Sequence, residues 1–259
     1  TNCYYNCKVA NDELGRFYTK DLLDHNIGTN LSQTTLPTGT TGRCLVLITP
    51  DAERTMTTFL GITSTIGPED VDEAAIKASK WVYIEGYLVT SEVSKAAAIK
   101  AKTIAQENGI PVAFTLSDSN IINFFYDQLT DVIGEGVDLL FCNESEAKEY
   151  SKTNTIDEAI EVLQSKAKSL AITLGKEGAQ VLHRVSNTNY NRDDIIKNTA
   201  PQVKAIDSNG AGDCFAGAFI ASIVQGKNAQ EAGDIACKAA GHVVSHFGPR
   251  LQPSFFVNN

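Results

Sequence analysis

The fold is decided by the stretch DSNGAGD at residues 207–213, which is followed by the apolar run CFAGAFI at residues 214–220. Small residues at the start of a helix leave backbone N–H groups open to a ligand, and together with the helix dipole these groups favour a phosphate-sized anion. A carboxylate in the first helical turn, here Asp213, can take a proton from a hydroxyl group that attacks phosphorus. Two glycines in a tight turn would by themselves be structural, but the whole stretch predicts the chemistry of a small-molecule kinase.

These fourteen residues resemble the C-terminal signature of the ribokinase/PfkB family of carbohydrate kinases, whose usual form is DTxGAGD followed by a helix of small residues. In that family the Gly-Ala-Gly amides form an anion hole, and the last aspartate is the catalytic base. The resemblance therefore assigns the anion hole to Gly210, Ala211 and Gly212 and the role of base to Asp213. Ser208 stands where threonine is commoner, which is a mild change.

The composition is that of an acidic globular protein. The chain has 259 residues, of which 42% are hydrophobic, and a net charge of −9. It has no block of Lys and Arg, so we expect neither nucleic acid nor a membrane as a partner. No run approaches the roughly 18 apolar residues of a membrane helix, and the start has no apolar signal-peptide core, which favours a cytoplasmic protein. The six cysteines are scattered, and we expect free thiols.

From residue 67 onward, strand-like and helix-like segments alternate, which predicts an α/β fold with a mostly parallel sheet between helices. The expected strands are 81–87, 112–116, 139–142, 170–174 and 179–183, and the expected helices are 90–108, 121–133, 155–168, 212–225 and one that begins after Asn228. Strand-like segments at 44–49 and 54–59 flank a polar turn and predict a β-hairpin. The resemblance implies a single ribokinase-like domain over residues 1–259, a three-layer αβα sandwich with a small β lid within residues 1–65.

The segment NESE at residues 143–146 follows a buried strand and is expected in the crevice beyond the carboxyl end of the sheet. An asparagine at a strand end, followed by acidic residues, is favoured for helix capping alone. The segment also resembles the NxxE motif of the family, which is linked to Mg²⁺ and phosphate. The resemblance therefore implies that Asn143 contacts the nucleotide and that Glu146 holds the metal through water.

The segment TLGKEGA at residues 173–179 is by itself an ordinary hairpin turn. It also resembles the TxGxxG segment of the family, which approaches the ATP phosphates and so makes Thr173, Gly175 and Gly178 nucleotide contacts. Asp207 either holds its loop through side-chain hydrogen bonds or, by resemblance, takes part in cofactor binding. Some family members bind a monovalent cation here, and K⁺ stays an open alternative.

Arg54 lies between two expected strands, where an ion pair in a solvated turn would be worth little. The stretch TPDAERTMTTFLG at residues 49–61 resembles adenosine-kinase-like members of the family, in which an arginine near the substrate cleft offsets phosphate charge. The resemblance thus makes Arg54, with Asp213, a substrate-binding candidate.

The matching segments occur in the order of the family, from ANDELG at residues 10–15 and IEGYL at residues 84–88 to the final signature. They imply a kinase that uses ATP and Mg²⁺ to phosphorylate a primary hydroxyl of a ribonucleoside, with adenosine as the best single candidate. A kinase of a free ketose or ribose is the nearest alternative. A nucleotide-binding pseudoenzyme is another, whereas a Rossmann oxidoreductase is disfavoured because no GxGxxG motif follows an early strand.

One part of the family pattern does not occur in the sequence. Family members usually begin with a strand that carries a substrate-binding aspartate, followed by a GG-containing segment that ends in Asn. Either this part lies upstream, which the Thr at residue 1 favours, or the protein is a natural truncation with impaired function. The sequence is compatible with a monomer or a homodimer.

Overall fold

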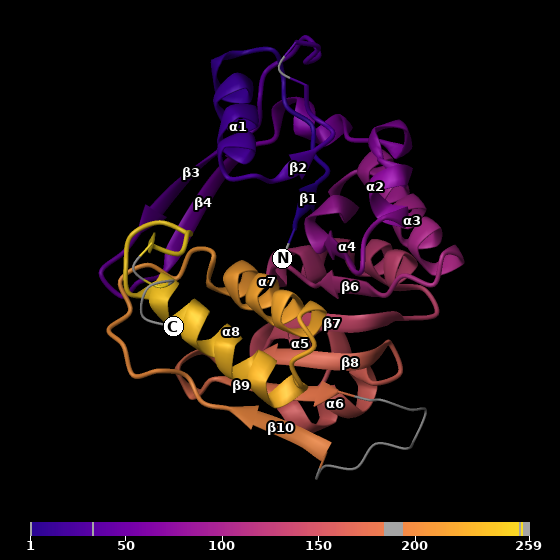
Figure 1. The fold of residues 1–259 in the computed structure, drawn as a ribbon. Helices are drawn as coiled ribbons and strands as arrows, with labels where there is room; N and C mark the ends of the chain where they lie inside the picture. Colours follow the sequence, from indigo (N-terminus) through magenta and orange to yellow (C-terminus); the bar gives the residue numbers. More distant parts are fainter. Residues whose placement is uncertain (1, 33, 184–193, 254, 256–259) are drawn as a thin grey trace.

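The computed structural model describes residues 2–32, 34–183, 194–253 and 255, and a six-stranded sheet forms its centre (Figure 1). The strand order is β10-β9-β8-β7-β6-β5. The strands are β5 (Val82–Glu85), β6 (Val112–Thr115), β7 (Val137–Asn143), β8 (Ala167–Thr173), β9 (Ala179–His183) and β10 (Ile195–Asn198). The first four are parallel, and β9 and β10 add antiparallel pairs. The predicted mostly parallel sheet is confirmed.

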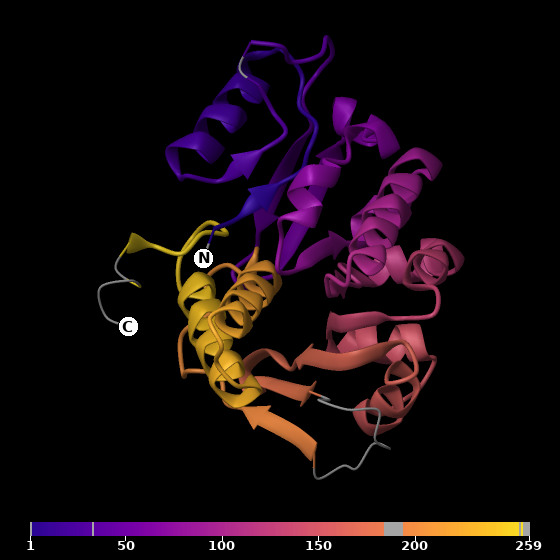
Figure 2. The ribbon, with the colours of Figure 1, turned by 45° about the vertical axis from the view of Figure 1, so that its right-hand side comes forward.

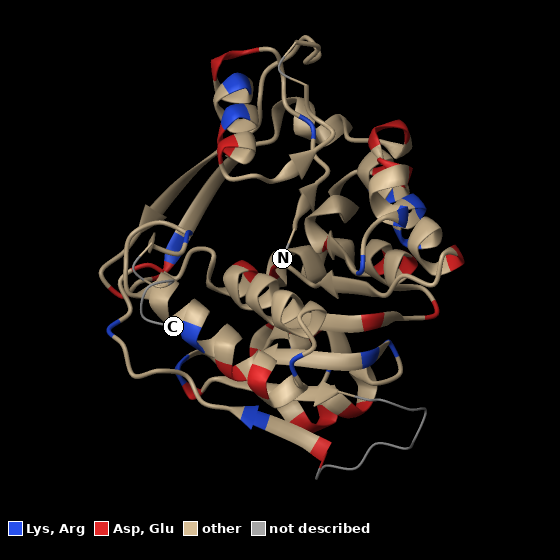
Figure 3. Cartoon of the chain, in the orientation of Figure 1, with Lys and Arg blue, Asp and Glu red and all other residues tan. Residues whose placement is uncertain are grey.

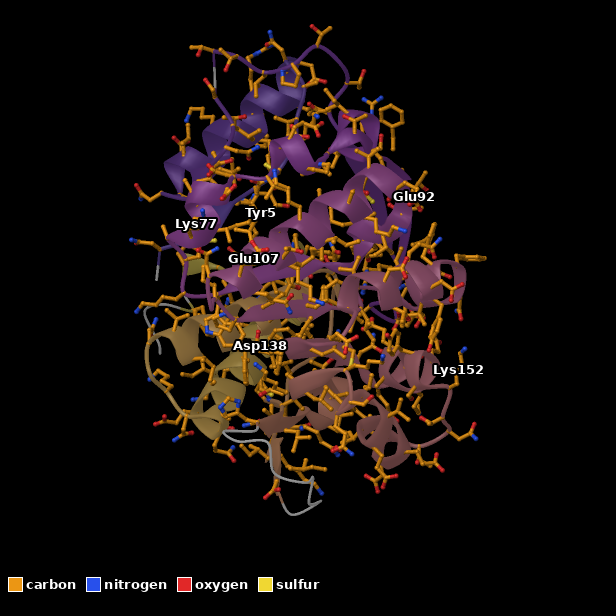
Figure 4. All side chains as sticks on the ribbon, turned by 90° about the vertical axis from the view of Figure 1, so that its right-hand side faces the viewer. Tyr5, Lys77, Glu92, Glu107, Asp138 and Lys152 are labelled. Carbon is orange, nitrogen blue, oxygen red and sulfur yellow. The ribbon has the colours of Figure 1, made fainter. Side chains whose placement is uncertain are left out.

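Helices cover both faces of the sheet, which confirms the three-layer αβα sandwich (Figure 2). One face carries α3 (Glu92–Glu107), α4 (Ser119–Ile133), α5 (Glu144–Ser151) and α6 (Ile156–Leu163), and the other carries α7 (Ala211–Val224) and α8 (Ala229–Val244). The labels at Glu92 and Glu107 mark the two ends of α3 (Figure 4). In β7, Leu140 packs in one core and Phe141 in the other, because successive side chains of a strand point to opposite faces.

The apolar run after the glycines anchors α7 on the sheet. Phe215 and Phe219 are buried, and their rings meet Phe141 edge-on with centroid distances of 6.4 and 5.9 Å. Burial of aromatic side chains contributes roughly 1.5–3 kcal/mol each. This packing fixes where α7 begins, at the end of the sheet where β5 to β8 also end.

The N-terminal part forms a separate layer, shown in indigo and purple in Figure 1. There β3 (Arg43–Ile48) and β4 (Arg54–Phe59) pair as an antiparallel hairpin outside the main sheet, which confirms the predicted hairpin. The sequence did not predict α1 (Glu13–Asp24) or the short parallel pair β1 (Tyr4–Tyr5) and β2 (Gly28–Thr29).

One helix boundary was wrong. The predicted helix 155–168 begins as expected, with a capping box between Thr155 and Glu158, but α6 ends at Leu163. The Lys166 N–H donates to the Leu163 carbonyl in a turn, and β8 begins at Ala167. No Gly or Pro marks this helix end, so the sequence pattern ran on into the strand. The strand β10 was also not predicted.

Shorter elements complete the fold. They are α2 (Glu73–Lys77) and the 3₁₀ helices η1 (Gly61–Thr65), η2 (Pro68–Asp70), η3 (Gly86–Thr90) and η4 (Gly175–Glu177). Lys and Arg are scattered over many elements instead of gathering on one (Figure 3). Within the described ranges, every helix is too short or too polar for a bilayer crossing.

Candidate functional site

The carboxyl ends of the parallel strands bring the predicted site residues to one edge of the sheet. Asn143 at the end of β7 lies in register with Thr173 at the end of β8. On the other side, Glu85 at the end of β5 pairs with Thr115 at the end of β6. This is the edge at which open α/β sheets bind ligands.

Three small residues shape the start of α7 at this edge. Gly210 occupies the N-cap in the left-handed region, with φ of 75°, and it offers no capping side chain. A Cβ atom there would lie 2.4 Å from the Pro249 Cβ, so the loop requires glycine. A Cβ at Gly212 would meet no atom within 4 Å. The space beside Gly212 is therefore open. The N–H groups in the first turn of α7, which begins at Ala211, suit an anion.

Asp213 lies in the first turn of α7. Burial raises the pKa of its carboxyl group, and the positive charge of Arg54 opposes that effect. Arg54 comes from β4, and its guanidinium donates to the Ser208 hydroxyl at 3.4 Å. The Ser208 N–H in turn donates to the Ala52 carbonyl at 3.2 Å. The hairpin therefore touches the glycine loop and brings Arg54 toward Asp213.

Asn143 and Glu146 form a reciprocal capping box at the start of α5. The Glu146 N–H donates to the Asn143 side chain at 2.8 Å, and the two Glu146 oxygens accept from the Asn143 N–H at 3.0 Å and its amide at 2.6 Å. Glu146 is only 6% exposed, and burial raises its pKa to about 7. Glu144 is exposed and pairs with Lys148 at 2.8 Å. The structure thus gives Glu146 a clear capping role, and its predicted metal role stays a prediction.

The turn after β8 divides into one open and one packed glycine. Gly175 has φ of 56°, and a Cβ there would meet nothing within 4 Å. Gly178 has φ of 101°, and a Cβ there would lie 1.9 Å from the Asn198 carbonyl oxygen. Packing against β10 therefore explains Gly178 without a ligand, whereas Thr173 and Gly175 lie at the open edge.

Asp207 is 3% exposed and holds the glycine loop. One carboxylate oxygen accepts from the Asn209 N–H and the other from the Gly248 N–H, each at 2.8 Å. These hydrogen bonds agree with the first predicted role of Asp207, which is to hold its loop. A cofactor or K⁺ role stays a prediction.

The sequence did not single out Glu85 as a site residue. Its pKa rises to about 7, chiefly because of burial and then because of the charge of Asp213. Ser117 donates its hydroxyl to Glu85 at 3.1 Å. Nothing in the sequence signalled it, because Glu85 lies inside the expected strand 81–87, and only the structure ends β5 at this residue.

The site gathers four carboxylates around one arginine. The negative charges of Asp213 and Glu146 raise the pKa of Glu85, and the charge of Asp118 raises that of Glu146. The positive charge of Arg54 works in the opposite direction and lowers the pKa of Asp213 and Glu146. Raised pKa values in a group of facing residues are typical of functional sites. In the part of the chain that the structure describes, no group of three or more His, Cys, Asp or Glu residues is arranged to hold a metal ion by itself.

A cavity of about 740 Å³ lies at the opposite edge of the sheet. Its lining includes Pro111, Glu135, Asp138 and Lys168. Asp138, labelled in Figure 4, accepts from the Val112 N–H at 2.7 Å and from Lys168 at 2.7 Å, so its carboxylate serves the start of two strands. We place the candidate site at the carboxyl edge, where the carboxylates and the start of α7 converge.

Comparisons with known proteins agree with this geometry. The sequence matches the pfkB family carbohydrate kinase over residues 2–254. It is 30% identical over 220 residues to an adenosine kinase of Dictyostelium discoideum, an alignment that covers 79% of this chain and 61% of that protein. The chain spans about three fifths of the length of such curated relatives.

Two solved structures are also similar. The fold superposes on an adenosine kinase from Sinorhizobium meliloti with a TM-score of 0.90 at 31% identity, covering 99% of this chain and 76% of the other. It superposes on a putative ribokinase II from E. coli, solved with ATP and Mg²⁺, with a TM-score of 0.81 at 25% identity, covering 96% and 79%.

Proposed function

The chain belongs to the pfkB family of carbohydrate kinases, and from that premise we propose that it transfers the γ-phosphate of ATP to a primary hydroxyl of a ribonucleoside, with adenosine as the first candidate. The observation that carries the proposal is the position of Asp213 in the first turn of α7, beside an N-terminus that Gly210 leaves without a side-chain cap. An anion held there would lie next to a carboxylate, which is the pairing that phosphoryl transfer to a hydroxyl requires.

In this proposal, different residues of the chain bind the phosphoryl group, accept the proton and contact the nucleotide. The N–H groups of residues 210–212 would stabilise charge on the transferring phosphoryl group, and Asp213 would accept the proton of the attacking hydroxyl. Arg54 would offset phosphate charge, and Thr173 and Gly175 would contact the nucleotide. Asn143 would also contact the nucleotide from the start of α5, Gly178 would keep the turn against β10, and Asp207 would hold the glycine loop in place.

The start of α7 and Glu146 are the two features that fit MgATP. The open space at Gly212 leaves the start of α7 accessible to a phosphate group. Both oxygens of Glu146 already accept hydrogen bonds, so Glu146 would reach Mg²⁺ through water, and nucleotide oxygens would supply most ligands. When bound, Mg²⁺ would neutralise charge on the phosphate oxygens.

Adenosine comes first because relatives and a structural neighbour near 30% identity are named adenosine kinases. A free sugar is the second candidate, because the E. coli neighbour is described as a putative ribokinase. We further propose one kinase domain over residues 1–259 in which the β3–β4 hairpin closes over the acceptor as a lid. A cytoplasmic location and a monomer or homodimer stay predictions.

The test is ADP release from MgATP by the full-length gene product, with adenosine, ribose and fructose offered separately. We expect turnover with adenosine, and we expect Asp213→Asn to lower kcat by about 10³-fold or more, because a base in the reaction is lost. Asp157→Asn removes the same charge from the first turn of α6 and serves as the matched control. Turnover with a free sugar alone would move the assignment to a sugar kinase. Nucleotide binding without turnover on any acceptor would contradict the proposal.

A further inference from the structure

The residues that follow α8 connect the glycine loop to the N-terminal layer. The Gly248 N–H donates to the Asp207 carboxylate at 2.8 Å. Pro249 lies against Gly210 so closely that a Cβ atom on this glycine would be 2.9 Å from the Pro249 Cα and from its carbonyl oxygen. The next residue, Arg250, reaches away from the loop to α1. The segment therefore contacts the loop at two points before its arginine binds elsewhere.

Arg250 and Asp21 form a two-point ion pair. Two guanidinium nitrogens of Arg250 donate to the two carboxylate oxygens of Asp21, at 3.1 and 2.6 Å. The residues are 229 positions apart, and the Asp21 side chain is only 17% exposed. These hydrogen bonds are the main cause that holds the pKa of the Asp21 carboxyl below its usual range. Two parallel hydrogen bonds to a guanidinium fix its direction as well as its distance.

The helix α1 is held in place at its start and along its buried side. Its N-cap, Asp12, accepts hydrogen bonds from the Thr41 N–H at 2.8 Å and from the Thr41 hydroxyl at 2.6 Å. Thr19 and Leu22, which flank Asp21 in the sequence, are buried. Asp21 therefore projects from a helix that is fixed to the rest of the N-terminal layer, and it can serve as a fixed partner for the arginine.

The pair is a weak source of stability, because the Arg250 side chain is 64% exposed and exposed ion pairs contribute little to folding. A second exposed pair, Lys20 with Asp24, lies within α1 itself. The pair of Arg250 with Asp21 differs from it because it joins two separate parts of the chain. We therefore expect its effect on the geometry of the glycine loop and not on the free energy of unfolding.

The geometry of this loop matters because its N–H groups belong to the predicted anion site. Gly210 is the N-cap of α7 and has φ of 75°. Glycine loses more conformational freedom on folding than any other residue, so a loop that depends on it needs outside contacts to keep one arrangement. Hydrogen-bond donors that are already in position stabilise a transition state without reorganisation. The β3–β4 hairpin supplies such contacts at Ser208, and the segment after α8 supplies them at Asp207 and Gly210.

We propose that Arg250 and Asp21 are positioning residues, which hold the segment after α8 against Gly210 and so keep the glycine loop in the arrangement that binds a phosphoryl group. Neither residue touches the reacting atoms in this proposal. The inference rests on the proposed kinase function for its effect on turnover, whereas the holding of the loop can be measured without a substrate. The N-terminal layer thus supports the loop at a second place, besides the contact of Arg54 with Ser208.

Hydrogen–deuterium exchange of the full-length gene product tests the holding of the loop. The N–H groups of residues 207–209 all donate hydrogen bonds, so their exchange reports on opening of the loop. In Arg250→Gln we expect them to exchange roughly 3- to 10-fold faster, because a two-point contact is lost. Exchange in β7 should not change, and Tm should stay within about 2 °C of the wild type. Asp24→Asn, in the other exposed pair of α1, is the matched control and should leave the loop unchanged.

A double-mutant cycle and turnover complete the test. Asp21→Asn should act like Arg250→Gln, and the double variant should be no worse than either single variant, because all three lack the same pair. In each, kcat should fall by roughly 3- to 10-fold. Faster loop exchange in the variants, with no phosphorylation of any acceptor by the wild type, would contradict the proposed function and keep the inference about the loop. Unchanged loop exchange, equally faster exchange in β7, effects that add in the double variant, or an unchanged kcat in an active enzyme would overturn the inference.

Discussion

Replacement of Glu85 by Gln should make the protein more stable at pH 8. The pKa of Glu85 is about 7 in the folded protein and 4.5 for an ordinary glutamate, a difference of about 2.5 pH units. At 1.36 kcal/mol per unit, this corresponds to about 3 kcal/mol. For an acid whose pKa is raised on folding, the stabilising contribution is full below pH 4.5 and is lost as the pH rises through 7. Gln carries no charge, so it avoids this loss.

The net gain should be smaller than the full value, because the amide binds the Ser117 hydroxyl less strongly than a carboxylate does, a loss of about 1 kcal/mol. We therefore expect Glu85→Gln to gain about 2 kcal/mol at pH 8, or roughly 4–8 °C in Tm for a chain of this size. Scanning calorimetry at pH 5 and pH 8 measures it, with the exposed Glu107→Gln as the control. A gain that is equal at both pH values, or a lower Tm at pH 8, would refute the reasoning.

Two other sites give direct tests. Lys102 is buried and donates to the carbonyls of Val132 and Ile133 at the end of α4, so Lys102→Met should destabilise the protein by about 1–3 kcal/mol in urea unfolding, and an unchanged midpoint would contradict this. Gly210→Ala should lower Tm by several degrees because its φ is positive and its Cβ meets Pro249, whereas Gly212→Ala should leave Tm within about 2 °C and still lower ADP release. Equal Tm losses in both glycine variants would show that the space at Gly212 is not free.

Most of the sheet was predictable because its strands are short apolar runs that end at turn residues. The strand 139–142 was predicted inside β7, and α8 begins after Asn228 as predicted, with a capping box between Asn228 and Glu231. Apolar runs and helix caps depend only on residues that are near one another in the sequence, so they can be predicted from it. The predicted end of α6 was wrong because no Gly or Pro separates the helix from β8. Pairing within the main sheet determines where β8 begins.

The candidate site was predictable where a motif carries it and not where long-range contacts build it. The contact between Arg54 and Ser208 joins residues 154 positions apart, and the sequence did not predict it; a resemblance only placed Arg54 near the substrate cleft. Glu85 was missed because one acidic residue at a strand end has no pattern of its own. Its importance follows from Ser117 and Asp213, which the chain brings to it from two other elements.

The raised pKa values show where the fold places charge against its own stability. Ionising Glu85, Glu146 and Asp213 is unfavourable in the folded chain, and each of them lies where a strand ends or a helix begins. The positive ends of α5 and α7 offset part of that cost for Glu146 and Asp213, since both lie in a first helical turn. Glu85 is the last residue of β5 and precedes only the short 3₁₀ helix η3, which its side chain does not cap, and the Ser117 hydroxyl in the loop after β6 donates to its carboxylate. A carboxylate at this position therefore costs the folded chain stability as the pH rises through 7, which is why Glu85→Gln is expected to gain stability at pH 8 and not at pH 5.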